Sequence, residues 1–555
     1  MSLESIETRA ERSRGFDAAT LCEAFQATAE QFSDRVALRT PGGETELTWS
    51  QYGDAVRRVA GGLAALGVGH GDTVATMLIN RPEFHIVDTA ALHLGAIPFS
   101  VYNTSAPEQI EYLFANARNR VVVTERRFLD AIDAVRAPGL EHVVVLDEGL
   151  PEAEHPDFDA AWRAVAPTDV ATLIYTSGTT GPPKGVQLTH ANIMFGSAGA
   201  EQVLSLSAAT RLVSYLPCAH IADRFFAHYP SIIAGACITS VADATQIIAA
   251  LPDARPSTWL AVPRIWEKLK AALETRGVTD PSALTEEQRA AIRAGLGLDG
   301  ADMLLSGAAP IATEVLEFFM ALGLPVFEGW AMSETACVGA INLPGAIRVG
   351  TVGRPFPGVE ITLADDGELL LRGPNVMAGY RDDPEQTAEA IDADGWLHTG
   401  DIAEIDGDGY VRLVDRKKEL IINSGGKNMS PANIEQRLKA ASPLIGQACA
   451  IGDRRPYNVA LIVLDPDGAA ARARALGIED TSPAALAADP EIEAEVAAAV
   501  EQANGRLSRI EQIKRFTVLP TDWLADGDEL TPTMKLKRRV IVEKYATEID
   551  ALYAD

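Results

Sequence analysis

Cysteine is scarce in this sequence and offers no obvious cross-link. The five cysteines are scattered and no two form a C-x-x-C pair: Cys22, Cys218, Cys237, Cys337 and Cys449. An odd number of isolated cysteines indicates neither a disulfide framework nor a cysteine-ligated zinc site. We therefore expect the chain to work in the reducing cytoplasm.

Long apolar runs and an excess of basic charge are also missing. Nowhere do 18 apolar residues follow one another, and residues 1–15, MSLESIETRAERSRG, lack an apolar segment, so we expect neither a membrane span nor an export signal. With 48 basic against 77 acidic residues, the formal net charge is −29. Such a charge argues against nucleic-acid binding and against attraction to anionic lipid. It leaves open a peripheral membrane contact through an apolar patch.

The length and the pattern of the chain predict an α/β protein of two parts. A chain of 555 residues exceeds what one hydrophobic core usually serves. From about residue 355 the sequence changes to short strands and acidic turns, which predicts a small β subdomain that closes the large one. We expect a large N-terminal domain over 1–415, and a smaller, mobile α+β domain over 416–555 with helices in its alanine-rich stretch 468–504.

A loop rich in glycine and threonine is the most informative segment. Residues 176–185, TSGTTGPPKG, follow the apolar run ATLIY and are suited to a polyphosphate, because glycines let backbone N–H groups approach an anion. The spacing differs from the GxxxxGK[ST] phosphate loop, and a plain surface turn is the alternative. The expected phosphate contacts are Thr176, Ser177, Gly178, Thr179, Thr180 and Lys184.

Three predicted strands run into loops that can share one site. They are ATLIY (171–175), DMLLS (302–306) and LPVFE (324–328), and the last two lead into GAAP and GWAMSET. In open α/β sheets, ligands bind beyond the carboxyl ends of the strands. We therefore expect these loops to face a common site.

Several motifs in a fixed order give the chain a family resemblance. The Gly/Thr loop is followed by FEGWAMSET (327–335), GWLHTGD (395–401), VDRKKELIINSGGKN (414–428) and TPTMKLKRR (531–539). This set, which spans nearly the whole chain, resembles the adenylate-forming superfamily of acyl-CoA synthetases, adenylation domains and luciferases. The segments 100–113, 215–224 and 262–270 look most like the long-chain and bubblegum-type fatty acyl-CoA synthetases.

The resemblance implies a nucleotide site built on FEGWAMSET. The segment Glu328, Gly329, Trp330, Ala331 and Met332 would line it opposite Gly307, Ala308 and Ala309. The family has a tyrosine–glycine pair where this chain has Trp330 and Ala331. A tryptophan keeps a flat ring that can stack on adenine. Ala331 adds a methyl group that the family's glycine lacks, and this group would affect how deeply the base or the acyl group can enter the site. The alternative for Trp330 is a core aromatic.

Ser333 and Glu334 match the family positions for an α-phosphate contact and a magnesium ligand. A carboxylate beside phosphates is reasonable only with a cation between them. A Ser/Glu capping pair at a helix N-terminus is the alternative reading. Asp401 would accept hydrogen bonds from the ribose hydroxyls, with Arg416 as a further donor, although HTGD also reads as a tight turn. His220 resembles a family position between phosphate loop and acyl pocket, where we favour positioning over proton transfer, because a carboxylic acid is already ionised at neutral pH.

The C-terminal part would supply a mobile lysine and a second loop. Lys535 matches the lysine of the family's T-x-x-G-K pattern, although Met534 replaces the glycine, Lys537 is close by, and a solvated basic run is the alternative. The resemblance places a hinge at Lys418. Swinging about it would bring in the loop Ser424, Gly425, Gly426 and Lys427, so that CoA can reach the acyl adenylate.

The resemblance implies an enzyme that joins a medium- or long-chain fatty acid to CoA with ATP and Mg²⁺, through an acyl adenylate. A ligase that delivers the acyl group to a carrier protein, or a CoA ligase for an aryl, branched or steroid acid, is the alternative among enzymes. A catalytically inactive nucleotide-binding protein is the alternative outside them. The presence of Lys184, Glu334, Asp401 and Arg416, with a C-terminal lysine, disfavours the inactive protein.

Overall fold

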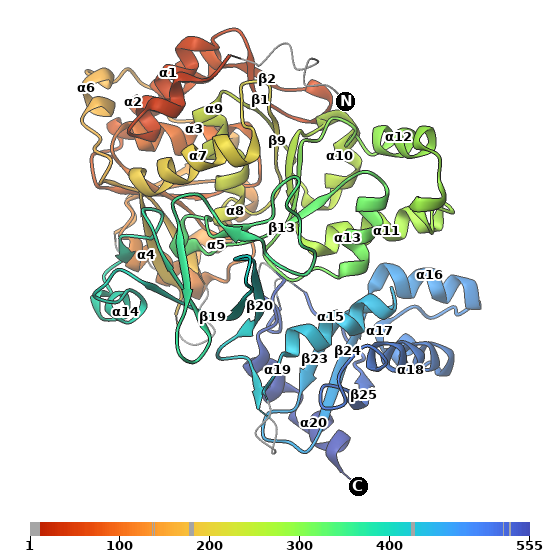
Figure 1. The fold of residues 1–555 in the computed structure, drawn as a ribbon. Helices are drawn as coiled ribbons and strands as arrows, with labels where there is room; N and C mark the ends of the chain where they lie inside the picture. Colours follow the sequence, from red (N-terminus) through yellow and green to blue (C-terminus); the bar gives the residue numbers. More distant parts are fainter. Residues whose placement is uncertain are drawn as a thin grey trace.

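The structure, a computed structural model, has the predicted α/β class (Figure 1). It describes residues 11–135, 137, 139–176, 182–422, 428–524, 527–531 and 534–554. Among the helices of these residues, none combines the length and the apolar character needed to cross a membrane. All five cysteines are free.

The largest sheet places the phosphate-loop candidate at its edge. Its strand order is β18-β8-β7-β4-β3-β5-β6. The bounds are β3 (Thr73–Met77), β4 (Ile97–Ser100), β5 (Val121–Thr124), β6 (His142–Val145), β7 (Val170–Thr176), β8 (Lys184–Thr189) and β18 (Gly379–Tyr380). The strands from β3 to β7 are parallel and mostly buried, as their valine-rich sequences predict. Strands β7 and β8 are antiparallel and pair Thr176 with Lys184, so they bracket the Gly/Thr segment.

Two further sheets complete the main body. One has the order β2-β1-β10-β9 and the other β11-β12-β13-β14-β15. Their bounds are β1 (Val36–Arg39), β2 (Glu46–Thr48), β9 (Arg211–Ser214), β10 (Cys237–Ser240), β11 (Thr258–Ala261), β12 (Met303–Ser306), β13 (Val326–Trp330), β14 (Ala340–Ile341) and β15 (Arg354–Pro355). The strands predicted at 302–306 and 324–328 are therefore confirmed, and β13 continues as far as Trp330.

Helices enclose these sheets. In chain order they include α1 (Leu21–Gln31), α2 (Trp49–Ala65), α3 (Pro82–His93), α4 (Pro107–Ala117), α7 (His190–Leu204), α8 (Ile221–Asp223), α9 (Tyr229–Ala234), α10 (Ile247–Ala254), α11 (Pro263–Thr275), α12 (Glu286–Gly295) and α13 (Thr313–Ala321). Between α8 and α9 lies a π-helical turn, η5 (Arg224–His228). Such turns are rare and often mark functional regions.

The predicted β subdomain is a four-stranded antiparallel sheet of order β16-β17-β19-β20. Its strands are β16 (Glu360–Leu363), β17 (Glu368–Arg372), β19 (Leu397–Ile405) and β20 (Val411–Arg416). The register of β19 and β20 places Asp401 opposite Arg416. Helix α14 (Pro384–Ala390) lies between β18 and β19 in the chain.

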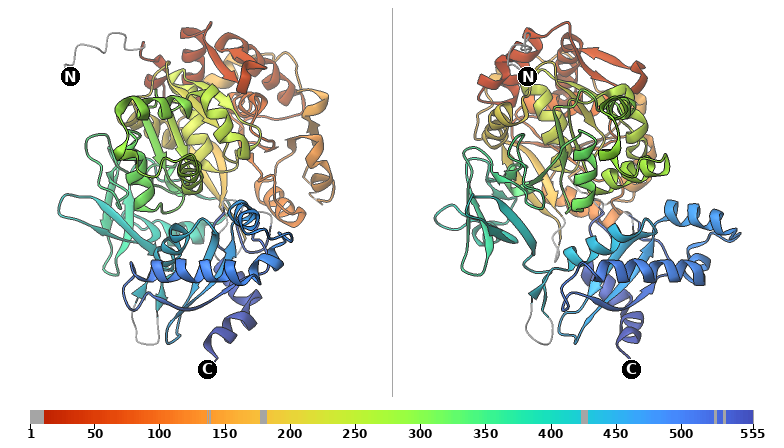
Figure 2. Two further views of the ribbon diagram at one scale, coloured as in Figure 1. Left: turned by 90° about the vertical axis from the view of Figure 1, so that its right-hand side faces the viewer. Right: turned by 45° about the vertical axis from the view of Figure 1, so that its right-hand side comes forward.

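The C-terminal elements have their own core. They include β23 (Ile445–Ile451), β24 (Asn458–Leu464), β25 (Ile513–Val518), α15 (Pro431–Ala441), α16 (Pro466–Leu476), α17 (Pro483–Ala487), α18 (Pro490–Asn504), α19 (Arg538–Lys544) and α20 (Ala546–Tyr553). Helices within 468–504 are thus confirmed. Figure 2 shows these elements, in blue, as a body beside the larger one. The boundary at 415/416 stays a prediction.

Charged side chains join the C-terminal body to two helices of the larger one, α11 and α13, which lie above it in Figure 1. Lys268 Nζ lies 3.0 Å from an Asp467 carboxylate oxygen, and Arg264 pairs with Asp465. On α13, Glu314 accepts from Arg437 at 3.4 Å and also pairs with Arg506. Except for Asp465, which is buried, these side chains are partly or largely exposed.

A fully buried charge cluster anchors the segment 215–224 through its last residue, Arg224. Arg224 Nη1 lies 2.6 Å from Asp88 Oδ2, and neither side chain is exposed. The guanidinium also donates to the Cys218 carbonyl at 3.1 Å and to Ser100 Oγ at 3.0 Å. His228 Nε2 is 3.0 Å from the other oxygen of Asp88. The ion pair and its hydrogen bonds therefore tie together three segments, around Asp88, around Ser100 and over 218–228.

Replacing Arg224 by methionine should strongly destabilise the larger body. It leaves the Asp88 carboxylate buried without its cation, which typically costs about 3–5 kcal/mol. The measurement is the thermal unfolding midpoint, compared with that of the double variant Asp88→Asn/Arg224→Met. The double variant should recover part of the loss, because it removes the orphaned charge. A single variant as stable as the parent protein would contradict this account of the cluster.

Candidate functional site

The end of the β7–β8 hairpin carries Lys184, the candidate phosphate-loop lysine. Lys184 begins β8 opposite Thr176, and its Nζ lies over the ring of Tyr380, 4.7 Å from the centroid. Ser177, Gly178, Thr179 and Thr180 lie outside the described residues.

The loops after β12 and β13 lie next to each other. Ser306 and Glu328 are register partners on these parallel strands, so Gly307 and Gly329 follow side by side. Ala308 and Ala309 are exposed beyond the strand end. Burial raises the pKa of Glu328 to about 7, and its carboxylate accepts one hydrogen bond, from the N–H of Gly350 at 3.1 Å. Ala331 and Met332 continue from β13 and are half-buried.

The Asp401 carboxylate joins β13 to the β subdomain. Trp330 Nε1 donates to Asp401 Oδ2 at 2.7 Å, and Arg416 Nε lies 2.7 Å from Asp401 Oδ1. Burial raises the pKa of Asp401, and the charge of Arg416 works against that rise. The tight-turn reading of HTGD is wrong, because Thr399, Gly400 and Asp401 lie within β19. Trp330 is buried, as a core aromatic would be, yet its polar edge is directed at a ribose-binding candidate.

Glu334 is buried and held by a tyrosine. It lies in a short 3₁₀ turn, Ser333–Thr335, whose start is bonded by Thr335, because Thr335 Oγ1 accepts from the Met332 N–H at 3.0 Å. The reading of Ser333 and Glu334 as the capping pair is therefore wrong. Tyr380 Oη donates to Glu334 Oε1 at 3.0 Å. Ser333, beside it, is half-buried.

The donor set around Glu334 suits magnesium shared with phosphate. In the described part of the chain, no group of three or more His, Cys, Asp or Glu side chains is arranged to hold an ion. Magnesium is commonly held by one or two carboxylates plus substrate phosphates and waters. A single buried carboxylate near a phosphate-loop lysine fits that pattern.

His220 lies where it can act only as a neutral group near pH 7. It caps α8, and its Nδ1 accepts from the N–H of Ala222 at 3.1 Å. Burial lowers the pKa of His220 to about 4, and the charge of Lys535 adds to that effect. This agrees with a positioning role and argues against a stored proton.

Lys535 reaches the same site from the C-terminal body. Although the residue as a whole is exposed, burial of its amine and the charge of Arg416 lower the pKa of Lys535, while Asp401, Glu419 and Glu334 raise it. The Lys535 N–H donates to Thr531 Oγ1 at 3.0 Å, and Met534, at the family's glycine position, has a φ of 63°. Lys537 is directed elsewhere, because its Nζ donates to the Gly527 carbonyl at 3.3 Å.

The second loop is not described, and one site residue escaped the sequence analysis. Ser424, Gly425, Gly426 and Lys427 lie outside the described residues, while Lys418 is exposed after β20. Tyr380, which touches both Lys184 and Glu334, stands in the unremarkable segment MAGYRDD. No spacing rule signalled it; only the strand pairing of β18 with β8 brings it there.

Comparison with known proteins gives two family matches that together cover most of the chain. Residues 25–381 match the model of the AMP-binding enzyme, and residues 418–555 match the AMP-binding enzyme C-terminal domain.

Curated relatives and solved structures agree with these matches. FadD11 of Mycobacterium tuberculosis, which bears a fatty-acid–CoA ligase name, is 51% identical over 72% of this chain and 76% of its own. The long-chain-fatty-acid–CoA ligase FadD15 of the same species is 35% identical over 92% of each chain. The anthranilate CoA ligase AuaEII, solved with anthranoyl-AMP, has a TM-score of 0.77 at 21% identity, covering 96% of this chain and 98% of its own, which shows a shared fold.

Trp330→Ala should weaken ATP binding more than acid binding. Loss of stacking on a base typically costs about 1–3 kcal/mol. Trp330→Phe is the matched variant, because it keeps a ring and removes only the donor to Asp401, so its loss should be smaller. Calorimetric Kd values for ATP, beside the KM for the acid, check this. An unchanged ATP affinity in folded Trp330→Ala would assign the indole to the core or the acyl pocket.

Proposed function

Because the chain belongs to the AMP-binding enzyme family, we propose that it activates a medium- or long-chain fatty acid as an acyl adenylate and transfers it to CoA, releasing pyrophosphate and then AMP. The fatty-acid names of its relatives support the choice of acid, and their CoA ligase names support the acceptor. Among structural observations, the contacts of Asp401 carry most weight, because Trp330 Nε1 donates to one carboxylate oxygen and Arg416 Nε lies beside the other, both at 2.7 Å. The C-terminal body supplies Lys535, on whose amine the charges of Arg416, Asp401 and Glu334 act.

The proposed roles follow from charge and geometry. Lys184 and the backbone of the Gly/Thr loop would hold the phosphates that leave as pyrophosphate. Trp330 would stack on adenine, and Asp401 would accept from the ribose hydroxyls while Trp330 and Arg416 fix its orientation. The Lys535 ammonium would donate to the charge that develops on the α-phosphate, which Ser333 also contacts. Preorganised donors of this kind are effective because they need no rearrangement during the reaction.

Glu334 would hold Mg²⁺ together with the phosphates. The metal, when bound, neutralises charge on the phosphate oxygens. The protein's own part is to orient the Glu334 carboxylate, to which the Tyr380 hydroxyl donates a hydrogen bond.

The second half-reaction is proposed to use a different arrangement of the C-terminal body. Lys535 would leave after a rotation about Lys418, and the loop 424–427 would approach. Arg264, Lys268, Arg437 and Arg506 hold the present arrangement through ion pairs that solvent can reach. Such pairs are worth about 0–1 kcal/mol each, so their loss does not prevent the rotation.

The acceptor of the acyl group, contact with a membrane and the cellular location are separate proposals. Delivery to a carrier-protein thiol is the alternative to CoA, and contact with a membrane surface is an addition that no observation here requires. The cytoplasm is the proposed location, because five free cysteines suit a reducing compartment.

With ATP, Mg²⁺ and CoA, the protein should convert medium- or long-chain fatty acids to acyl-CoA. Pyrophosphate should be released in step with loss of the free CoA thiol, and both should depend on the acid. A panel of acids of graded length and shape measures the preference. Acid-dependent pyrophosphate release without a thioester from any acid would contradict the CoA step and favour a carrier protein or release of the adenylate.

Lys535→Ala should depress adenylation by about 10²–10³-fold, the usual cost of losing one preorganised donor at a developing charge. Thioester formation from presynthesised acyl adenylate should survive. Lys537→Ala is the matched control, since its amine bonds to Gly527 instead, and adenylation should stay near the parent rate. If the two variants exchanged these behaviours, the assignment of the mobile lysine would be wrong.

A further inference from the structure

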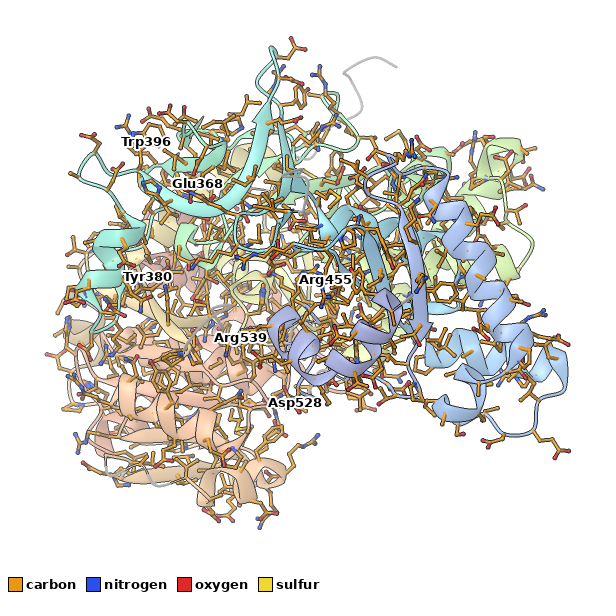
Figure 3. The ribbon with its side chains drawn as sticks, turned by 90° about the horizontal axis from the view of Figure 1, so that it is seen from below. Glu368, Tyr380, Trp396, Arg455, Asp528 and Arg539 are labelled. Atoms are coloured by element: carbon orange, nitrogen blue, oxygen red, sulfur yellow. The ribbon has the colours of Figure 1, made fainter. Side chains whose placement is uncertain are left out.

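Tyr380 contacts both charged groups of the proposed phosphate and metal site. Its hydroxyl donates to Glu334 Oε1 at 3.0 Å, and the Nζ of Lys184 lies 4.7 Å from its ring centroid. Tyr380 and Glu334 are each 8% exposed, so the bond between the hydroxyl and the carboxylate is shielded from water. Figure 3 places Tyr380 beside the teal helix α14, where the β subdomain meets the N-terminal part of the chain.

The backbone around Tyr380 is fixed at both ends. On one side, the Met377 N–H donates to the carbonyl of Glu334 at 2.9 Å. On the other, Gly379 and Tyr380 pair with Gln187 and Val186 of β8, the strand that Lys184 begins. The side chain of Asn375 adds bonds to the carbonyls of Thr335 at 3.2 Å and Val338 at 2.9 Å. The segment 375–381 is therefore bonded both to the turn that carries Glu334 and to the strand that Lys184 begins.

The two contacts have different physical effects. The bond from the hydroxyl to the carboxylate is charge-assisted. Hydrogen bonds of this kind are shorter and stronger than those between neutral groups. The hydroxyl occupies Oε1, and within the described part of the chain no hydrogen bond to the other carboxylate oxygen is seen, so a cation could bind there. The ring face attracts the Lys184 ammonium without neutralising it, since a cation–π contact adds no counter-charge. This contact therefore orients the Lys184 amine without pairing it with an anion.

We propose that Tyr380 is a positioning residue that orients Glu334 for Mg²⁺ through its hydroxyl and Lys184 for phosphate through its ring. This rests on the proposed function, since it takes magnesium–ATP as the ligand. The hydroxyl and the ring serve different partners, so removal of each should have its own signature.

Tyr380→Phe removes the hydroxyl and keeps the ring. The measurement is the calorimetric Kd of a non-hydrolysable ATP analogue, with Mg²⁺ and with EDTA. The gain in affinity that Mg²⁺ brings should fall about tenfold, the effect of losing one hydrogen bond to a charged group. Affinity in EDTA should stay within about twofold of the parent protein. Tyr380→Leu, which also removes the ring, should in addition weaken binding in EDTA.

Three controls make the result specific. Tyr52→Phe removes another buried hydroxyl, one that is 2.7 Å from Thr89 Oγ1, and should leave both Kd values unchanged. Glu334→Gln should abolish most of the Mg²⁺-dependent gain, and adding Tyr380→Phe to it should cause no further loss. Thermal unfolding of each variant verifies that it is folded.

The possible outcomes separate this inference from the proposed function. If the parent protein bound the analogue equally well with Mg²⁺ and with EDTA, the magnesium–ATP site itself would be wrong. If the parent showed the gain and folded Tyr380→Phe kept it in full, or lost affinity equally in both conditions, the positioning role alone would be overturned. Additive losses in the Glu334→Gln/Tyr380→Phe double variant would also overturn it, because the tyrosine would then act independently of Glu334.

Discussion

The site depends on one buried anion, the carboxylate of Asp401. Burial by itself disfavours an ionised group, and the structure offsets this with a cation at 2.7 Å and an indole N–H at 2.7 Å. Those partners come from β20 and β13, so the carboxylate joins the β subdomain to the five-stranded sheet that contains β13. The charge of Asp401 also acts favourably on the amine of Lys535, which the C-terminal body supplies, while Arg416 opposes it. The carboxylate proposed to hold the ribose thus also acts on a side chain of the C-terminal body.

Much of this arrangement could be predicted from the sequence, because its signals are local. The strands ending at Ser306 and Thr176 are apolar runs closed by small residues, and such runs are recognisable without a partner. Trp330, Asp401 and Arg416 were identified by motif resemblance, and the structure brings them into contact. What the motifs did not contain was the Trp330–Asp401 bond, since a hydrogen bond between distant residues leaves no pattern in either segment.

The residues that escaped prediction act across long sequence separations. Tyr380 meets Glu334 only because β18 pairs with β8, and a two-residue strand has no periodicity to detect. Asp88 and Arg224 form their ion pair inside the protein, from a helix of otherwise ordinary composition and a π-helical turn. Aspartate and arginine are mostly exposed to solvent in proteins, so the sequence alone favours surface positions for both. Only the packed structure shows that each supplies the partner that makes burial of the other tolerable.

The contrast between buried and exposed ion pairs also explains which parts can move. The Arg224–Asp88 pair is inaccessible and bonded to three segments, so separating it would strand a charge in a low-dielectric interior. The pairs that join α11 and α13 to the C-terminal body are reached by water, which replaces each lost partner at little cost. Ion pairs across this boundary can therefore be exchanged at little cost, whereas the Arg224–Asp88 pair cannot. In the proposed mechanism the C-terminal body releases Lys535 after adenylation, and exchangeable contacts suit that movement.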